Sequence, residues 1–345
     1  MFSKLNIVDN EKTQFDINNK GDLKISLING LKRTIYGKIP VYAIDTTSIN
    51  FITNNTTYDN SFLTLRLALI PIRSDLDIDY ENTVIEYHYK NNDELIHSCY
   101  CKDFQVDNPE LFAYPETLFT KIKPSQELHF TCKLSKNNCL SKNASYCCVS
   151  NASYKFKLDE KAIQEKVEEE NMTEEEERSF RTLEGKRLYL KNKDDEPSVY
   201  HFTLENCGNY DNQTIMNYGI DILSLQLKDL ATAFNENNTE KFNIQKANSK
   251  FDSYDITVVD ENDTIGNLLT TYLTDNNEVD YAAYKIPHPL HNKLVFRIAC
   301  KNNDITTIME VINDTIKVIL NILENMKKEW NASYKSSNKK KNSKK

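Results

Sequence analysis

The sequence is poor in glycine and proline, with seven and eight residues respectively among 345. So few glycines argue against a tight phosphate-binding loop, and none of the glycine-rich nucleotide-binding patterns occurs. A Gly-x-Ser-x-Gly turn and a His-Glu-x-x-His helix are also missing. Because no pattern pairs a nucleophile with a base or builds a cofactor cradle, we expect no catalytic residue and no cofactor in this chain.

Long hydrophobic segments are missing as well. The first residues contain no apolar core of signal-peptide length, and the densest apolar run, Leu67–Ile72, is far too short to cross a bilayer. We therefore expect an intracellular protein that is not secreted and does not contact a membrane. In such a protein the eight cysteines are expected to be reduced.

Acidic residues exceed basic ones by 51 to 43, which gives a formal net charge of −8. This balance argues against a protein whose main task is to neutralise phosphates, so we expect contact with DNA or RNA only through a complex. A hydrophobic content of 39% excludes a wholly disordered chain, and the length allows about two domains.

Hydrophobic periodicity predicts two halves with a similar order of elements. In the first half, helical spacing over 22–35 is followed by strand-like segments and, after 199, by a strand and an amphipathic helix over 214–234. The second half repeats strand, helix, strand and helix over 254–259, 264–273, 293–300 and 305–326. Since the last helix is longer than a small domain needs, we expect its apolar face to pack against the other half.

Three segments lack this periodicity. The glutamate-rich residues 159–187 predict a solvated helix or a disordered insertion, which we favour over an acidic docking site. Residues 241–250 are polar and predict a linker, and residues 331–345, with six lysines, predict a disordered basic tail. We expect the tail to keep the chain end solvated rather than to bind nucleic acid.

The cysteines and histidines are the candidate metal ligands of the sequence. Six cysteines lie close together in the sequence: Cys99, Cys101, Cys132, Cys139, Cys147 and Cys148. Structural zinc sites commonly use two close pairs with Cys-x2-Cys spacing, which is missing here, so we expect free thiols and keep a zinc site as the alternative. His288 and His291 are suitably spaced for a metal, but no cysteine or carboxylate pair accompanies them, and no metal is expected there.

Three stretches resemble one protein family. Residues 28–35 and 38–45 resemble the Asn-Ala-Leu-Arg-Arg helix and the Pro-x-x-Ala-Ile-Asp strand of the alpha-like subunits of multi-subunit RNA polymerases. Residues 62–72 are similar to their His-Arg-Leu-Gly-Leu-Ile-Pro element. The sharpest match is Asp263–Leu269, with Tyr281–Leu290 downstream, which resembles the eleventh-subunit family of eukaryotic RNA polymerase II.

The resemblance extends in order along the chain. Residues 139–149 fall where the third-subunit family has a Gly-x-Gly-Lys-x-His-Ala-Lys-Trp-x-Pro-Val loop, of which Lys142 and the spacing match. Five residues depart from the family pattern: Gly30, Lys32, Leu65, Ala68 and Ala283. Residues 73–82, where many third-subunit relatives carry a zinc loop, contain no cysteine, so no zinc of that kind is expected.

The resemblance implies an α+β fold in which two alpha-like dimerisation modules, each an antiparallel sheet with helices, form an intramolecular pseudo-dimer. A third-subunit-like module is fused to an eleventh-subunit-like module, as in large eukaryotic DNA viruses. The implied parts are a first module over 1–46 and 199–240, a β-rich insert over 47–198, a linker over 241–250, a second module over 251–330 and a tail over 331–345.

The implied function is that of a non-catalytic assembly platform of a DNA-directed RNA polymerase. Its partners would be the two large subunits, which carry the active centre and its magnesium, together with small subunits; no homodimer is required. The implied pseudo-dimer core is Leu31, Ile35, Leu268, Leu269, Tyr272, Ile316, Ile319 and Leu323. The implied large-subunit interface is Lys32, Arg33, Arg66 and Pro71. Such a subunit would work in a viral factory in the host cytoplasm and in the virion, or otherwise in the nucleus.

Two other classes stay open. A nucleic-acid-binding accessory protein would use the lysine-rich tail, and its affinity would fall steeply with salt. A metal-binding accessory protein would use the central cysteines and would hold stoichiometric zinc.

Overall fold

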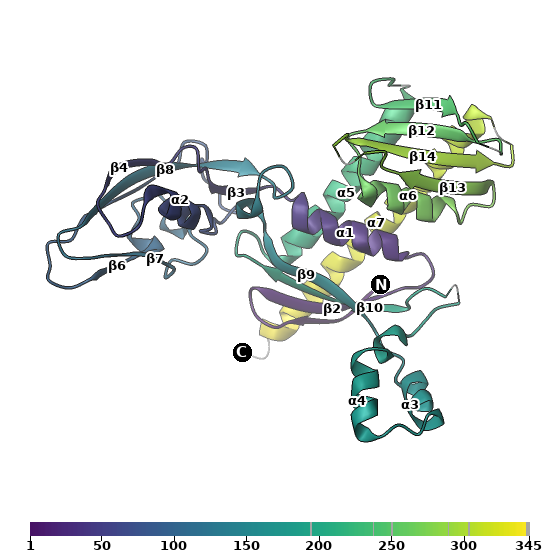
Figure 1. The fold of residues 1–345 in the computed structure, drawn as a ribbon, viewed down its shortest axis with the longest axis horizontal. Helices are drawn as coiled ribbons and strands as arrows, with labels where there is room; N and C mark the ends of the chain where they lie inside the picture. The colour runs from purple at the N-terminus through teal and green to yellow at the C-terminus, as the bar shows by residue number, and fades with distance from the viewer. Residues whose placement is uncertain (194, 237, 250, 289, 303, 343–345) are drawn as a thin grey trace.

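The computed structural model describes residues 1–345 except 194, 237, 250, 289, 303 and 343–345. The chain is an α+β protein with antiparallel sheets. Figure 1 shows a central group of helices with one sheet below it and another at the upper right, a lobe that extends to the left, and a small helical hairpin that projects downward. No described helix combines the length and the apolar character that crossing a membrane would need.

The first module is built on a four-stranded antiparallel sheet. In spatial order its strands are β1 (Phe2–Ile7), β2 (Lys12–Asn18), β10 (Val199–Asn206) and β9 (Val149–Phe156). Its buried side chains join one hydrophobic cluster with those of α1 (Ile25–Gly37) and α5 (Asn212–Asn235). The sequence pattern predicts neither β1 nor β2, because Thr13 and Asp16 are buried beside the apolar residues of β2 and hide the alternation.

β9 corrects the expected extent of the insert, 47–198. It pairs with β10 so that Tyr154 lies opposite Phe202, and therefore belongs to the sheet of the first module. The hydroxyl of Tyr154 also donates a hydrogen bond to Oδ1 of Asn29 on α1, at 2.8 Å. A strand pattern shows that β9 exists but not which sheet it joins, since pairing partners far away in the sequence leave no local signal.

The second module has a similar layout. In spatial order its strands are β11 (Phe242–Lys246), β12 (Tyr254–Val259), β14 (Lys293–Cys300) and β13 (Val279–Lys285), and its helices are α6 (Asp263–Leu273) and α7 (Ile305–Asn342). β11 lies inside the expected linker, 241–250. Only Phe242 in this strand is fully buried, so the apolar signal is too weak to reveal it.

α7 corrects the prediction of a disordered tail over 331–345. The helix continues to Asn342, and Trp330 and Tyr334 are buried in the main hydrophobic cluster. Their spacing of four residues continues the apolar stripe of α7, but lysines and serines dominate the surrounding composition and hide it. Residues 343–345 lie outside the described part of the chain.

The lobe at the left of Figure 1 is a folded insert with its own core. Its elements are β3 (Val41–Ile44), β4 (Asn50–Asn54), α2 (Asn60–Ala68), β5 (Val84–Lys90), β6 (His97–Tyr100), β7 (Leu118–Ile122) and β8 (Glu127–Asn137). β8 pairs with β3, β4 and β5, while β6 pairs with β7. Short 3₁₀ helices lie at Cys101–Asp103, Pro109–Leu111 and, beyond β8, Ala144–Tyr146. Leu63 and Leu67 of α2 pack into this core beside Phe130.

The glutamate-rich residues 159–187 form a helical hairpin, which we call the acidic hairpin. It consists of α3 (Glu160–Glu169), α4 (Glu174–Thr182) and a 3₁₀ turn at Gly185–Arg187. Asp159 caps α3, and Thr173 and Glu176 form a capping box at the start of α4. The segment is therefore a solvated helical structure, one of the two forms that we expected.

Candidate interface between the two modules

The helices of both modules share one hydrophobic core. All eight residues predicted for the pseudo-dimer core are buried in the same cluster: Leu31, Ile35, Leu268, Leu269, Tyr272, Ile316, Ile319 and Leu323. α1 packs against both α5 and α6, and α7 packs against α5 and α6. Because buried residues of one module continue directly into those of the other, the two modules bury their helix faces against each other.

Close packing of α1 on α5 depends on Gly219. A Cβ atom at this position would lie 2.6 Å from Cγ1 of Ile35 and 3.2 Å from Cδ1 of Leu31. At Gly30, where the alpha-like family has alanine, a Cβ atom would lie 3.6 Å from Cγ2 of Thr264 on α6, which is an ordinary contact. Glycine is therefore required at 219 but not at 30.

Polar side chains align α5 with α7. Nδ2 of Asn331 donates to Oδ1 of Asn217 at 3.1 Å, and Oδ1 of Asn331 accepts from Nε2 of Gln213 at 2.8 Å. Nζ of Lys327 contacts both carboxylate oxygens of Asp221 at 2.6 Å. These hydrogen bonds and the ion pair form only when the paired residues of α5 and α7 lie at the same level, so they favour one axial position of the two helices.

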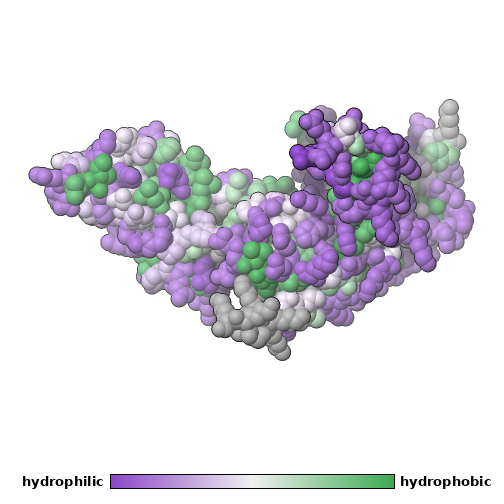
Figure 2. Space-filling view, turned by 90° about the horizontal axis from the view of Figure 1, so that it is seen from below, coloured by the Kyte–Doolittle hydropathy of each residue, from purple (hydrophilic) through white to green (hydrophobic). Residues whose placement is uncertain are grey.

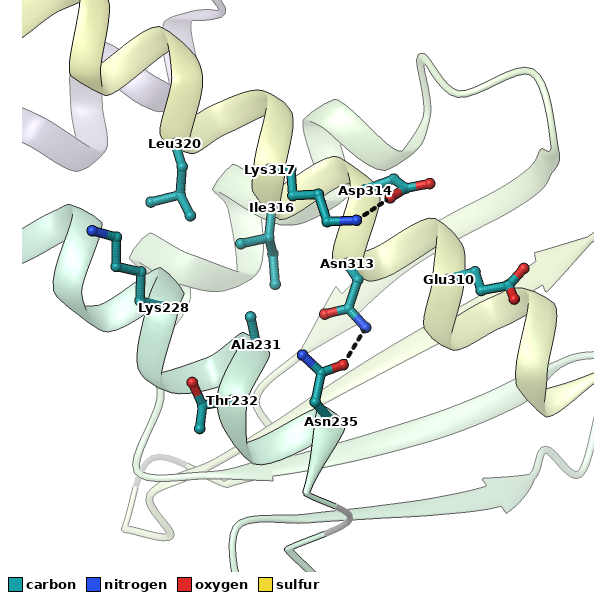
Figure 3. Close-up of a pocket in the computed structure, with 10 residues that line it drawn as sticks. All are labelled: Lys228, Ala231, Thr232, Asn235, Glu310, Asn313, Asp314, Ile316, Lys317 and Leu320. Atoms are coloured by element: carbon teal, nitrogen blue, oxygen red, sulfur yellow. Dashed lines mark hydrogen bonds and ion pairs between the residues drawn. The ribbon is translucent and has the colours of Figure 1, made fainter.

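Toward their other ends, the same two helices leave a groove of about 540 Å³. Figure 3 shows Ile316 and Leu320 of α7 on one side of it and Ala231 of α5 on the other. At its rim Nδ2 of Asn313 donates to Oδ1 of Asn235 at 3.0 Å. The groove is thus lined by residues of the two packed helices.

Tyr272 forms polar contacts across the module boundary. Its hydroxyl donates to the carbonyl oxygen of Asp22 at 2.9 Å and accepts from the backbone N–H of Lys24 at 3.3 Å. Nζ of Lys24 in turn lies 2.8 Å from Asp275, just after α6. Burial raises the pKa of Tyr272 to about 12, so the hydroxyl stays neutral and keeps both bonds at physiological pH.

A half-buried pair of opposite charges also comes from both modules. Lys38 follows α1, and Glu261 precedes α6. Burial lowers the pKa of Lys38 and raises the pKa of Glu261, and the attraction between the two groups partly opposes both shifts. The boundary between the modules thus contains titratable groups as well as apolar contacts.

Two of the four residues predicted to meet a large subunit lie at a cleft between the modules. Lys32 and Arg33 of α1 line this cleft, of about 330 Å³, together with Asp263 and Tyr284 of the second module. Arg33 is exposed, whereas Nζ of Lys32 lies 5.6 Å from the centre of the Tyr154 ring, within range of a cation–π contact. Residues of α1 and of the second module together thus form the walls of this cleft.

The other two residues lie in the insert and are not brought to this cleft. Nε and Nη2 of Arg66 donate to the carbonyl oxygens of Phe119 and Leu118, at 2.7 and 2.8 Å. The carbonyl oxygen of Pro71 accepts from the backbone N–H of Ala113 at 3.1 Å. The guanidinium of Arg66 therefore holds α2 on β7.

An exposed apolar stripe on α2 was missed at the sequence level. Phe62, Leu65 and Leu69 follow each other at helical spacing with exposed fractions of 41–59%, and the ring of Tyr58 stacks on Phe62 at 4.7 Å. We call these four residues the α2 stripe. The opposite face, including Leu67, is buried, so a search for two apolar faces on one short helix would have found the stripe.

Within the residues that the structure describes, no three His, Cys, Asp or Glu side chains are grouped so that they could hold a metal ion. Cys99 and Cys101 are buried in the insert, and burial raises the pKa of each thiol to about 12. Both therefore stay protonated near neutral pH and are poor nucleophiles and metal ligands. The rings of His288 and His291 lie 5.2 Å apart.

Comparison with known proteins identifies the second module. Residues 253–329, which include α6 and most of α7, match the family described as the RNA polymerase Rpb3/Rpb11 dimerisation domain. This part of the chain is thus similar to the dimerisation domain of RNA polymerase subunits, and the resemblance predicted from Asp263–Leu269 and Tyr281–Leu290 is confirmed.

Named relatives agree with this family. The chain is 39% identical over 64 residues to the probable DNA-directed RNA polymerase II subunit RPB11 of Caenorhabditis elegans, a match that covers 19% of this chain and 52% of the relative. It is 30% identical over 78 residues to the probable RNA polymerases I and III subunit RPAC2 of the same organism, covering 23% and 53%. It is also 30% identical over 79 residues to the RNA polymerase II subunit RPB11 of Schizosaccharomyces pombe, covering 22% and 63%. The chain thus spans about half the length of the first two relatives.

Proposed function

We propose that this chain is a non-catalytic assembly subunit of a multi-subunit DNA-directed RNA polymerase, in which a third-subunit-like and an eleventh-subunit-like module pair within one chain. The observation that carries the proposal is the shared core, in which α6 and α7 of the Rpb3/Rpb11-type domain pack on α1 and α5 of the first module. Since this dimerisation domain finds its partner in the same chain, no second copy is needed.

The strands that share a sheet define the parts of the subunit. We assign the first module to residues 1–39 and 149–235, with the acidic hairpin inserted in the second segment, the insert to residues 41–137, and the second module to residues 242–342. The short connections between them then tether two halves of one interface, which gives pairing a high effective concentration.

Two surfaces support docking of the two large subunits. The cleft beside Lys32 and Arg33 presents positive charge at the module boundary and suits an acidic segment of one large subunit. The α2 stripe suits an apolar surface, since contiguous exposed apolar side chains of this size commonly mark contact sites. DNA, RNA and the catalytic magnesium would then be held by the large subunits, in the nucleus or, for a viral polymerase, in the viral factory and virion.

The experiment is affinity purification of the tagged full-length chain from its native source, followed by mass spectrometry and a promoter-independent transcription assay. We expect two large subunits in stoichiometric amounts and RNA synthesis in the eluate. The variants Arg33→Glu and Leu65→Asp should each recover less of a large subunit while keeping the wild-type unfolding transition, since both side chains are exposed. A chain that purifies alone would contradict the proposal.

A matched control separates docking from a general effect of an added charge. Leu95 is 80% exposed in a loop of the insert, outside the α2 stripe. Leu95→Asp is therefore expected to recover both large subunits at the wild-type level, and a loss equal to that of Leu65→Asp would remove the support that the α2 stripe gives.

A further inference from the structure

The acidic hairpin occupies a place where the fold does not require a long connection. β9 and β10 are antiparallel neighbours, paired up to Phe156 and Tyr200, so a short turn could join them. Residues 157–198 lie between them instead, and a bridge between Leu158 and Tyr189 forms the neck of the hairpin. Insertions of this length in a compact domain commonly serve a function.

The hairpin is a small folded unit rather than a loose loop. Ile163, Val167 and Phe180 form a core that is separate from the main cluster. Arg181 of α4 joins the two helices through Nη1, which lies 2.9 Å from Glu160 of α3, and its Nε lies 2.7 Å from Glu177 on its own helix. The surface of the hairpin is therefore held in one arrangement before any partner binds.

A groove of about 290 Å³ lies on this unit. It is lined by Glu170, Met172, Glu176, Ser179, Phe180, Leu183 and Glu184. Leu183 lies at the edge of the groove and is 67% exposed. It is not one of the residues that form the hairpin core. In Figure 2 a hydrophobic area ringed by hydrophilic surface lies on the part of the molecule nearest the viewer, where the hairpin projects.

The charge around the groove is negative. The hairpin contains eleven acidic and six basic side chains, and Arg181 is already bonded to two of the carboxylates. Among the described ion pairs, none includes Glu170 or Glu184. The groove therefore combines an exposed apolar side chain with carboxylates that have no basic partner within the described residues.

We propose that this groove docks a basic segment of a partner protein, which inserts one large apolar side chain beside Leu183 and places lysine or arginine side chains near Glu170 and Glu184. Charge complementarity identifies the occupant, because a nucleic acid or an acidic peptide would be repelled. A second copy of this chain does not suit the groove, since a chain with a formal net charge of −8 would also be repelled by it.

The first test uses the purified full-length chain and a fluorescent lysine-rich peptide with one central leucine. We expect saturable binding by anisotropy that weakens as salt is raised, and at least tenfold weaker binding of two control peptides. One control replaces leucine with serine, and the other replaces lysine with glutamate. Equal binding of the leucine and serine peptides, or no binding at all, would overturn the proposal.

Variants of the chain locate the binding site. Glu170→Lys combined with Glu184→Lys, and separately Leu183→Ser, should each weaken binding at least tenfold, whereas Glu81→Lys on the exposed surface of the insert should weaken it less than threefold. Wild-type affinity in the hairpin variants would place the peptide elsewhere. At the neck of the hairpin, the N–H of Asp159 donates to the carbonyl oxygen of Leu188 at 3.0 Å, so a short turn can replace residues 160–187. This deletion should abolish peptide binding and keep the main unfolding transition.

Two other occupants are outcomes that would contradict the proposal. Hairpin-dependent self-association in sedimentation equilibrium would identify a second copy, and a cross-link from residue 183 to the lysine-rich end of α7 would identify the chain's own tail. The peptide assay contains no polymerase subunit, so its failure leaves the proposed function intact. Failure of the large subunits to co-purify, in turn, would not contradict the proposal for the groove.

Discussion

At the scale of single residues, two helical glycines are expected to respond oppositely to the same substitution. Gly219→Ala should lower the free energy of unfolding by about 1–3 kcal/mol, because the new methyl group would overlap Ile35. Gly30→Ala should raise it by up to about 1 kcal/mol, because the new methyl group would make only ordinary contacts and alanine favours the helix. Urea denaturation measures both, and an equal loss in the two variants would contradict the packing described for α1.

Tyr272 should make stability depend on pH in the alkaline range. Its pKa of about 12 in the folded chain lies above the ordinary value of 10.0, so folding favours the neutral phenol. This stabilisation is complete below pH 10 and is lost as the pH rises through about 12. Tyr272→Phe should cost about 1 kcal/mol near neutral pH, since two hydrogen bonds are lost, and should lose less stability than wild type above pH 10.

The control for this prediction is Tyr58→Phe, because Tyr58 is 44% exposed. It should leave the stability near neutral pH unchanged. Chemical denaturation at a series of pH values provides the comparison, and an alkaline slope in Tyr272→Phe equal to that of wild type would show that this hydroxyl does not titrate as described.

At the scale of elements, α7 offers neighbouring positions that differ in burial. Ile316 is 1% exposed in the shared core, and Val318, two residues later, is 51% exposed. Ile316→Asp should abolish soluble protein by burying an unpaired charge, at a cost of more than about 4 kcal/mol, whereas Val318→Asp should remain within about 0.5 kcal/mol of wild type. Soluble yield and gel filtration check this prediction. Soluble, fully assembled Ile316→Asp protein would show that the α7 face does not form the shared core.

The elements that sequence periodicity predicted well are those with a strong helical pattern. Leu268 and Leu269 in α6, and Ile316 and Ile319 in α7, stand at three-and-four spacing, and all are buried in the main cluster. β11 was not predicted, because its local pattern is dominated by polar residues even though Phe242 is buried. The hydrophobic pattern of a segment shows which of its side chains face the core. It does not reveal an element that has few buried side chains.

The candidate interface was predictable only in part for a related reason. A motif resemblance could suggest Lys32, Arg33 and Arg66 together. It could not show that the guanidinium of Arg66 donates hydrogen bonds to backbone carbonyls within the insert. The sequence shows that α2 has two apolar faces, with Phe62 and Leu65 on one and Leu67 on the other, but it does not show which face is covered. Exposure depends on the tertiary neighbours of α2, and these come from residues far along the chain.

At the scale of the whole molecule, Trp330 connects the two modules. Its ring lies 4.8 Å from that of Phe15 and 5.3 Å from that of Phe2, and its Nε1 donates to the carbonyl oxygen of Gln213 at 3.2 Å. Trp330→Ala should cost about 3–5 kcal/mol, because it leaves a large cavity between α7 and the first sheet. Differential scanning calorimetry should show the loss in a single transition for both modules, and Lys328→Ala, an exposed neighbour, should leave that transition unchanged.

The contact between Trp330 and Phe2 also bears on when the chain can fold during synthesis. The first sheet begins with β1, but α7, which packs against β1, lies at a much later position in the sequence. The part of the sheet that α7 covers therefore stays open to water, and to chaperones, until α7 has been translated. A chain whose synthesis stops before α7 is therefore expected to leave Phe2 and Phe15 without their contact to Trp330.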